Sequence, residues 1–249
     1  MCGRFALATP PEKLRQLLDF KNQPNFPPRY NIAPSQPVLA IRQPSGSREA
    51  ALLQWGLVPG WMKPERLADT GNRPQINARG ETVHEKPFFR DAYKHRRCLI
   101  PADAFYEWQR RPSSAAQPYC VRRRDTQPFM MAGIWELWQG ADGSEIESCA
   151  VITTAANQTL TPVHHRMPVM LAQDHWESWL ATPSHKSAAF SSLSSLLVPA
   201  PEHDFTAYPV SKEVNKVSND SAALLTETLP VADKAKPEKK KSDDQMDLF

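Results

Sequence analysis

Seven short runs rich in aromatic and β-branched residues limit what this chain can fold into more than any other feature of its sequence. They are bounded by glycine, proline and other turn-forming residues, as strands are in small β-sheets. The runs cover residues 38–42, 51–58, 97–108, 119–124, 129–137, 148–156 and 205–210. A Ser-Gly-Ser turn between the first two predicts a hairpin, and residues 101–103 predict a turn within the third. The pattern predicts an α+β protein with an antiparallel, β-rich, barrel-like core flanked by helices.

Three helices are expected beside this core. The first begins near Thr9, which precedes two prolines and is followed three residues later by Glu12, the arrangement of a capping box. Its apolar stripe consists of Leu14, Leu17 and Leu18. Residues 88–95 predict a second short helix, and residues 174–180 predict a third whose two tryptophans are spaced for core contact.

Composition narrows the class of protein. With 249 residues, of which 41% are hydrophobic, the chain is long enough for one sizeable core. No stretch approaches about twenty consecutive apolar residues and the N-terminus lacks the regions of a secretory signal, so we expect a cytoplasmic protein without a membrane span. Cys98, Cys120 and Cys149 are far apart and lack the spacing of zinc ligands. We expect them to be buried apolar residues, and we predict neither a metal nor another cofactor.

The composition changes near residue 222. Residues 230–244 hold five lysines and four acidic residues with almost nothing apolar, so they cannot form a packed core. We therefore predict one domain over residues 2–221 and a disordered tail over residues 222–249. The chain ends in Gln245-Met246-Asp247-Leu248-Phe249, which is either a frayed terminus or a short linear peptide ligand with apolar anchors.

The chemically most distinctive residue is Cys2. Once Met1 is removed, Cys2 carries a free α-amine and a thiol on adjacent carbons, a pair that no internal residue offers. An unperturbed α-amine has a pKa near 7.7–8.0, so about a quarter of it is neutral and nucleophilic at pH 7.4. Such an aminothiol condenses with an aldehyde to an imine, and addition of the thiol to the same carbon closes a five-membered thiazolidine. A cysteine at position 2 is also compatible with no special role.

Two segments carry candidate polar site residues. If residues 77–82 are extended, Asn77, Arg79 and Glu81 share one face, which is either a site or ordinary solvent-facing surface. Glu107 lies between two aromatic residues, and surroundings of this kind raise the pKa of a carboxyl group and suit it to proton donation. The alternation of a strand could equally point Glu107 towards water.

A loop bounded by prolines holds His164, His165 and Arg166. A histidine that titrates near neutral pH is a good general acid or base, although a loop histidine is more often a surface residue. Trp61 follows a Pro-Gly turn and could stack on a nucleic-acid base or fill the core.

Arginines gather in three short clusters although the formal net charge of +3 is too small to indicate a nucleic-acid partner by itself. The clusters are Arg96-Arg97, Arg110-Arg111 and Arg122-Arg123-Arg124. They indicate either solvated surface or phosphate contact.

Six motifs in order identify a resemblance that covers roughly residues 2–218. They are Met-Cys-Gly-Arg-Phe at 1–5, Arg-Tyr-Asn-Ile-Ala-Pro at 29–34, Trp-Gly-Leu-Val-Pro-Gly-Trp at 55–61, Asn-Ala-Arg-Gly-Glu-Thr at 77–82, Cys-Leu-Ile-Pro-Ala-Asp-Ala-Phe-Tyr-Glu-Trp at 98–108 and His-His-Arg-Met-Pro at 164–168. Together they closely resemble the SOS response-associated peptidase (SRAP) family. The members of this family are abasic-site processing proteins that crosslink covalently to DNA.

The resemblance implies the SRAP fold and a role for each motif. It implies that Cys2 forms a thiazolidine with the ring-opened aldehyde of an abasic site in single-stranded DNA near replication forks, which shields the site from strand cleavage. Asn77 would position the sugar or the Cys2 amine, Glu107 would move protons, and His164 would act as acid or base in adduct reversal or strand scission. The family pattern leaves the next position variable, so His165 could share that role.

The resemblance also suggests DNA contacts and a location. It implies phosphate contacts by Arg4, Arg79 and Arg166, with Trp61 and Trp108 beside the lesion. It further implies a monomer associated with the nucleoid at replication forks. The chain end resembles peptides that dock on the bacterial replicative sliding clamp, with Gln245, Met246, Leu248 and Phe249 as contacts and methionine where leucine is usual.

Two other functions fit the same residues. In the first, Cys2 is the nucleophile of a thiol peptidase with His164 as its base, acting on peptides or removing its own leader. In the second, the chain binds single-stranded DNA without chemistry, for which aromatic and basic residues suffice. A blocked α-amine would separate adduct formation from peptidolysis, since a thiol needs no amine to attack a peptide bond.

Overall fold

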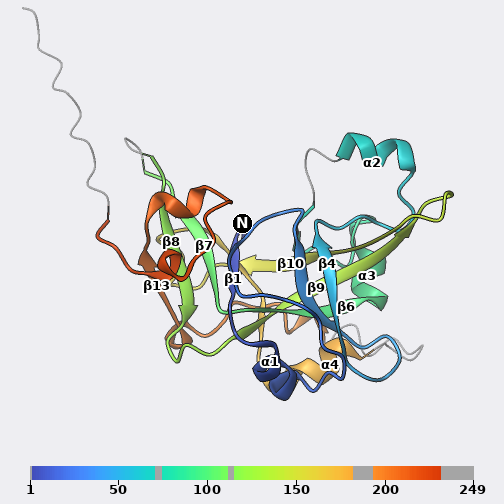
Figure 1. Cartoon of the computed structure of the whole chain (residues 1–249), viewed down its shortest axis with the longest axis horizontal. Coiled ribbons are helices and arrows are strands. Elements are labelled where there is room, and N and C mark those ends of the chain that lie inside the picture. The colour runs from blue at the N-terminus through green and yellow to red at the C-terminus, as the bar shows by residue number, and fades with distance from the viewer. Residues whose placement is uncertain (1, 71–74, 112–114, 182–192, 231–249) are drawn as a thin grey trace, which may run out of the picture.

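The computed structural model describes residues 2–70, 75–111, 115–181 and 193–230 (Figure 1). Five of its strands close into a barrel in the order β10, β4, β3, β6, β9 and back to β10. Their bounds are β3 Pro37–Arg42, β4 Glu49–Trp55, β6 Arg97–Ala102, β9 Phe129–Gln139 and β10 Glu145–Ala155. All neighbours in this ring are antiparallel except β10 and β4, which run parallel. The barrel-like core predicted from the sequence is thus confirmed.

A second sheet has five antiparallel strands in the order β13, β8, β7, β1 and β2. Their bounds are β1 Phe5–Leu7, β2 Arg29–Ile32, β7 Ala104–Gln109, β8 Gln117–Arg123 and β13 Phe205–Pro209. In Figure 1 this sheet lies to the left of the barrel, with β1 between β7 and the barrel strands. Three short strands extend the barrel sheet beside β9 and β10: β5 Asn77–Arg79, β11 Arg166–Pro168 and β12 Met170–Leu171.

Short helices flank the two sheets. They are α1 Pro11–Leu18, α2 Pro64–Thr70, α3 Arg90–His95 and α4 Trp176–Leu180, with 3-10 turns at Gln173–His175, Glu202–Asp204, Lys212–Asn215 and Ala222–Leu225. The first, second and third predicted helices correspond to α1, α3 and α4. Leu14 and Leu18 are buried on α1 as the apolar stripe predicts, and both tryptophans of α4 are buried.

The structure corrects the start of α1. Thr9 makes no capping bond, and Pro10 occupies the cap position. The Thr9 hydroxyl instead donates to the Asp103 carboxylate, which also accepts the backbone N–H groups of Ala8 and Thr9. Because Asp103 satisfies these donors from a distant part of the chain, the capping box predicted from the sequence does not form.

The run 97–108 is two strands, β6 and β7, and these belong to different sheets. The predicted turn is the point of passage between the sheets: Asp103 separates the strands, and its N–H donates to the Ala6 carbonyl on β1. The chain therefore crosses from the barrel to the second sheet at this residue, which places β7 beside the N-terminal strand.

The chain remains packed beyond residue 221. Leu224 is buried, and Val210 forms a bridge with Glu227. The tail residues 231–249, including the proposed peptide ligand at the chain end, lie outside the described residues.

The barrel interior has no space for an added methyl group at Gly133 of β9. A Cβ atom there would lie 2.7 Å from Cys98 Sγ and 2.8 Å from Ile100 Cδ1, both on the adjacent strand β6. We expect Gly133→Ala to lower the free energy of unfolding by about 1–3 kcal/mol, the usual cost of overpacking a core. Denaturant unfolding measures the change. The double variant Gly133→Ala/Cys98→Ala should recover part of the loss, and a cost in Gly133→Ala that is unaffected by Cys98→Ala would contradict this explanation.

Candidate active site

The N-terminal strand brings Cys2 to the end of β7. β1 pairs with β7, and the N–H of Tyr106 donates to the carbonyl of Arg4 at 2.9 Å. This register places Cys2, two residues before Arg4, beside Glu107. Cys2 is fully buried, and its Sγ lies 3.9 Å from the Arg4 carbonyl. Burial, reinforced by the charge of Glu107, raises the pKa of the Cys2 thiol, so the sulfur is held in its protonated form.

Asn77 reaches the same place from the barrel. β5 runs parallel to β10 with Asn77 opposite Val151, and the Asn77 Nδ2 donates to the Cys2 carbonyl at 2.8 Å. Its Oδ1 is buried and has no hydrogen-bond partner among the described residues. The side-chain amide of Asn77 therefore fixes the backbone of Cys2, and its Oδ1 atom is available beside Cys2 to accept a further hydrogen bond.

Glu107 and His164 form the next layer of the site. Glu107 is 3% exposed, and burial raises the pKa of its carboxyl group above the ordinary value. His164 Nδ1 lies 3.8 Å from Glu107 Oε1. The sequence left open whether Glu107 faces water, and the structure shows that both it and its neighbour Tyr106 are buried.

The two adjacent histidines differ in their surroundings: His164 lies beside Glu107, and His165 is exposed. His164 Nδ1 lies 3.0 Å from the backbone nitrogen of Arg166 and 3.2 Å from the Arg166 carbonyl oxygen, and it accepts from the first or donates to the second according to the tautomer of the ring. Burial lowers the pKa of His164. His165 stacks on it with ring centroids 4.4 Å apart and is exposed, and the charge of His164 lowers the pKa of His165. His164 is thus the ring that faces Glu107.

Two of the three arginines expected to contact phosphate have partners within the protein. Arg166 forms a bidentate ion pair with Glu81 at 2.5 and 2.9 Å and donates to the Thr153 carbonyl at 2.7 Å. Arg79 is exposed at the end of β5. Because β5 ends at Arg79, Glu81 lies in the following turn, so the shared strand face expected for residues 77–81 holds for Asn77 and Arg79 alone.

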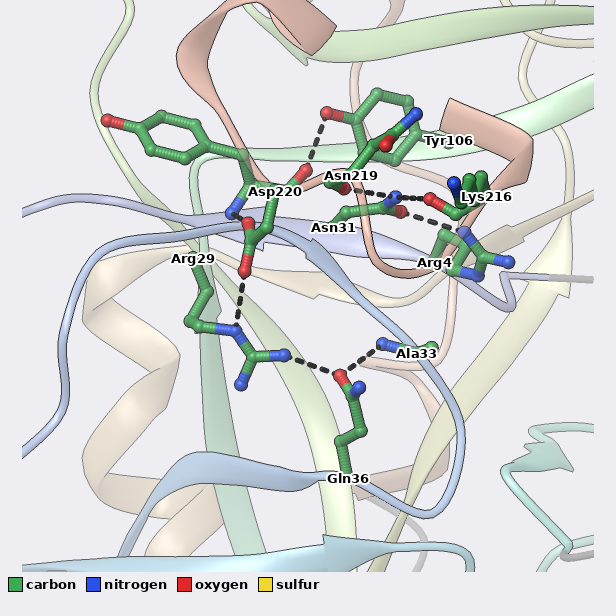
Figure 2. A network of polar contacts seen from close by, with 10 residues as sticks. Arg4, Arg29, Asn31, Ala33, Gln36, Tyr106, Lys216, Asn219 and Asp220 are labelled. Carbon is green, nitrogen blue, oxygen red and sulfur yellow. Dashed lines mark hydrogen bonds and ion pairs between the residues drawn. The ribbon is translucent and has the colours of Figure 1, made fainter. Parts of the chain in front are cut away.

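Arg4 has its partners in a loop from the far end of the chain. Its guanidinium donates to Asn31 Oδ1 at 2.8 Å (Figure 2). It also donates to the Val214 carbonyl at 2.7 Å and to the Asn215 carbonyl at 3.3 Å. The guanidinium groups of Arg4 and Arg166 already donate to acceptors within the protein, and a DNA phosphate would have to share them with these acceptors. Phosphate contacts by these two arginines remain predictions.

The two tryptophans differ in their surroundings. Trp61 is 58% exposed and packs edge-on against Phe88. Trp108 is half-buried, and its indole Nε1 donates to Asn215 Oδ1 at 2.7 Å. Asn215 and Asn31 were not among the residues predicted from the sequence. Asn31 lies within one of the six motifs, so the sequence did offer a reason to consider it. Asn215 lies in a polar loop outside these motifs, and the sequence gives no indication of its contact.

The arginine clusters have mixed roles. Arg97 is buried and donates to the carbonyls of Tyr93, Lys94, Trp179 and Ala181, so neither surface nor phosphate contact describes it. Arg96 is paired with Asp91 and Glu136, and Arg123 with Asp125. Arg110 is exposed at the end of β7. Arg110 follows Gln109, whose side chain donates to the carbonyl of Pro162, two residues before His164.

Two features are absent from the described part of the chain. No group of three or more histidine, cysteine, aspartate or glutamate residues is arranged there to hold a metal ion. In the same residues no helix has both the length and the apolar character needed to cross a membrane.

Comparison with known proteins places this site in a family. The profile of the family described as SOS response associated peptidase (SRAP) matches residues 1–217. The chain is 40% identical over 228 residues to the abasic site processing protein YoaM of Bacillus subtilis, covering 90% of this chain and 97% of that protein. It is 32% identical over 232 residues to the abasic site processing protein YedK of Escherichia coli, covering 90% and 99%.

A solved structure has a similar fold. The crystal structure of a protein from Bacteroides thetaiotaomicron superposes with a TM-score of 0.80 at 26% identity, covering 92% of this chain and all of that one. The match of the family profile spans both sheets and every residue of the Cys2 site described above, from Cys2 to His164. On this evidence the chain belongs to the SOS response associated peptidase (SRAP) family.

Proposed function

We propose that this protein processes abasic sites in single-stranded DNA by forming a covalent thiazolidine through Cys2. The observation that carries the proposal is the convergence of Cys2, Asn77, Glu107 and His164 from four separate segments on one small region. The names of the relatives, which are abasic site processing proteins, point to the same substrate. An abasic sugar has no base to recognise, so its ring-opened aldehyde is the group that distinguishes it, and an aminothiol reacts with aldehydes.

The reaction balances with the residues at hand. The neutral α-amine of Cys2 adds to the aldehyde carbon to give a carbinolamine, and the protonated form of Glu107, which burial favours by raising the pKa of the carboxyl group, donates a proton to the departing hydroxyl. Water leaves and a protonated imine remains. The thiol then adds to the imine carbon, its proton passes to the Glu107 carboxylate, and the nitrogen becomes the ring amine. The net change is loss of one water per crosslink.

Asn77 and His164 have supporting roles in this proposal. Asn77 holds the Cys2 carbonyl, and its unpartnered Oδ1 can accept a hydrogen bond from the α-amine or from a sugar hydroxyl. His164, neutral and 3.8 Å from Glu107, exchanges protons with the carboxyl group or acts on the sugar when the adduct reverses. Asn77 thus fixes geometry around the reacting centre, where small displacements have large effects on rate.

Intact mass measurement tests the proposal directly. The protein should be isolated without Met1, and incubation with an abasic oligonucleotide should give a species equal to protein plus DNA minus one water. An oligonucleotide with every base present should give no such species. Absence of the adduct in a protein shown to lack Met1 would refute the proposal.

The environment of Cys2 disfavours a thiol peptidase. Peptidases of that class use a thiolate with a lowered pKa, whereas burial raises the pKa of Cys2. His164, the base required by that mechanism, faces Glu107. Selective blocking of the α-amine decides between the two functions: adduct formation should disappear, whereas peptidolysis would continue.

The salt dependence of DNA binding should identify Arg79 as a phosphate contact. It is exposed beside Asn77 at the end of β5. In the non-crosslinking Cys2→Ala background, Arg79→Gln should weaken binding and reduce the slope of log Kd against log salt by about 0.7, the value for one contact to single-stranded DNA. Arg123→Gln is the matched control, because Arg123 is paired with Asp125. Equal slopes for Arg79→Gln and the control would remove Arg79 from the interface.

We propose also that the chain end tethers the protein to the replicative sliding clamp. The support is the sequence Gln-Met-Asp-Leu-Phe at the end of a charged segment that is poor in apolar residues. Deletion of residues 245–249 should abolish binding to the purified clamp, and Met246→Leu should tighten binding, since leucine is the usual residue there. Both variants should crosslink abasic DNA normally in the absence of the clamp. Unchanged clamp affinity after the deletion would contradict the proposal.

A further inference from the structure

The loop over residues 211–220, called here the C-terminal loop, is bound to the strands that carry the N-terminus. Figure 2 shows part of it beside Arg4 on the N-terminal segment and Arg29 and Asn31 on β2. Arg29 Nε pairs with Asp220 at 2.9 Å, and the N–H of Tyr30 donates to the same carboxylate. These contacts connect parts of the chain that are far apart in sequence.

Asn31 is the centre of the connection. It is fully buried, and its Oδ1 accepts the Arg4 guanidinium at 2.8 Å. Its Nδ2 lies 2.8–3.2 Å from the carbonyls of three residues of the loop, Val214, Lys216 and Asn219. A buried amide with partners on both of its polar atoms holds a backbone in one arrangement, because displacement would leave buried groups unpaired.

Arg4 binds the same part of the loop. Its guanidinium donates to the carbonyls of Val214 and Asn215, and the Val214 side chain is buried against the second sheet in a small cluster with Tyr106. The backbone of Asn215 is therefore held from both sides, by Arg4 and by the packing of its neighbour.

The side chain of Asn215 uses this fixed position to hold Trp108. Its Oδ1 accepts the indole Nε1–H at 2.7 Å, and Trp108 follows Glu107 on β7. Trp108 is half-buried and packs against the small cluster that contains Tyr106 and Val214, and the hydrogen bond to Asn215 holds its ring in one orientation there. Arg4 itself is two residues from Cys2. The loop therefore links the segment that carries the nucleophile to the indole of the residue that follows the proton donor on β7.

We propose that Asn215 is a positioning residue that fixes the Trp108 indole beside the Cys2–Glu107 site, and that Arg4 and Asn31 act as anchors for Asn215. The inference rests on the proposed function, since the ring would lie against the DNA next to the reacting sugar. It gives Arg4 a role within the protein that is separate from any contact with phosphate. It also explains why a loop far from the N-terminus in sequence is attached to it by a buried amide.

A double-mutant cycle tests the proposal. Asn215→Ala should slow crosslinking of saturating abasic single-stranded DNA by about threefold to tenfold, the range expected for loss of one hydrogen bond that orients a group in contact with the substrate. Trp108→Phe keeps an aromatic face without the N–H donor. In the Trp108→Phe background Asn215→Ala should cause no further change, because the two residues act through one bond. Lys216→Ala is the control, since the loop contact at that position uses its backbone carbonyl.

A measurement without DNA keeps the inference separate from the proposed function. The indole N–H resonance of Trp108, assigned by its absence in Trp108→Phe, should move and exchange faster with solvent in Asn215→Ala. It should keep its position in Asn215→Asp, which retains the acceptor. If the wild-type protein forms no adduct, the proposed function fails while the resonance still reports the contact. If the wild type crosslinks and Asn215→Ala reacts at the same rate, the inference is overturned. It is also overturned if Asn215→Ala lowers the crosslinking rate by the same factor in the wild-type and Trp108→Phe backgrounds.

Discussion

Cys2→Ser is expected to abolish the adduct that survives denaturation without a reducing agent. Serine is small enough for Met1 to be removed and keeps the α-amine, so the imine can still form, but it has no sulfur to close the thiazolidine. An imine hydrolyses when the protein is denatured, whereas borohydride reduces it to a stable secondary amine. We therefore expect a loss of at least about a thousandfold in stable adduct, with an adduct that reappears when borohydride is present during the reaction. Denaturing gels and intact mass measure both outcomes.

Cys120→Ala is the matched control for this variant. Cys120 is also buried and carries a thiol whose pKa burial raises to about 11, but it lies in the small cluster of the second sheet. It should crosslink as the wild type does. A stable adduct in Cys2→Ser without borohydride would assign the chemistry to another nucleophile, and loss of the adduct in both variants would indicate a general effect of removing a buried thiol.

The longer strands and a barrel-like core were predictable from the sequence, but the order in which the strands pair was not. Aromatic and β-branched residues identify β8, β9, β10 and β13 locally, and a turn identifies the β3–β4 hairpin. β10 follows β9 and pairs with it as a hairpin, but it also pairs parallel with β4 and β5, which are distant in sequence and which no local pattern connects to it. The passage between sheets at Asp103 depends in the same way on Thr9 and Ala6, which no local pattern connects to it.

In the candidate site, the main residues were predictable from the sequence, but the partners of their side chains were not. Family motifs indicated Cys2, Asn77, Glu107 and His164, and the structure brings these residues together. The partners of individual side chains could not be predicted, because they depend on long-range packing. Arg166 forms an ion pair with Glu81, and Arg4 donates to the C-terminal loop. Side chains that the resemblance suggested as phosphate contacts therefore have partners within the protein. Asn215 is the clearest example of a residue that sequence patterns could not identify. Its contact with Trp108 depends on the position of the C-terminal loop, which hydrogen bonds from Asn31 hold in place.

Glu107→Gln should slow crosslinking by about a hundredfold while leaving DNA binding unchanged. General acid–base catalysis by a positioned side chain contributes roughly that factor or more, and glutamine keeps the shape of the residue without a proton to donate. Single-turnover rates at saturating abasic DNA measure the loss, and binding is measured separately in the Cys2→Ala background. A normal rate would remove Glu107 from the mechanism.

The pH dependence of the rate gives this prediction a second readout. The α-amine of Cys2 must be neutral and Glu107 must be protonated, so the wild-type rate should rise and then fall with increasing pH. The falling limb belongs to Glu107, whose raised pKa extends its protonated form to higher pH than an ordinary glutamate allows. The Glu107→Gln rate should lack that fall, since glutamine does not titrate.

Stability should change in the opposite direction from activity in this variant, which separates catalysis from misfolding. Because burial raises the native pKa of Glu107 above its ordinary value of 4.5, the folded protein binds the proton more tightly than the unfolded chain. The resulting stability is fully present below about pH 4.5 and is lost as the pH rises through the raised native value. Glu107→Gln avoids the charged buried carboxylate, so its free energy of unfolding should match the wild type at low pH and exceed it increasingly towards neutral pH. A variant that is both inactive and less stable at pH 7 would show that Glu107 supports the fold instead of the reaction.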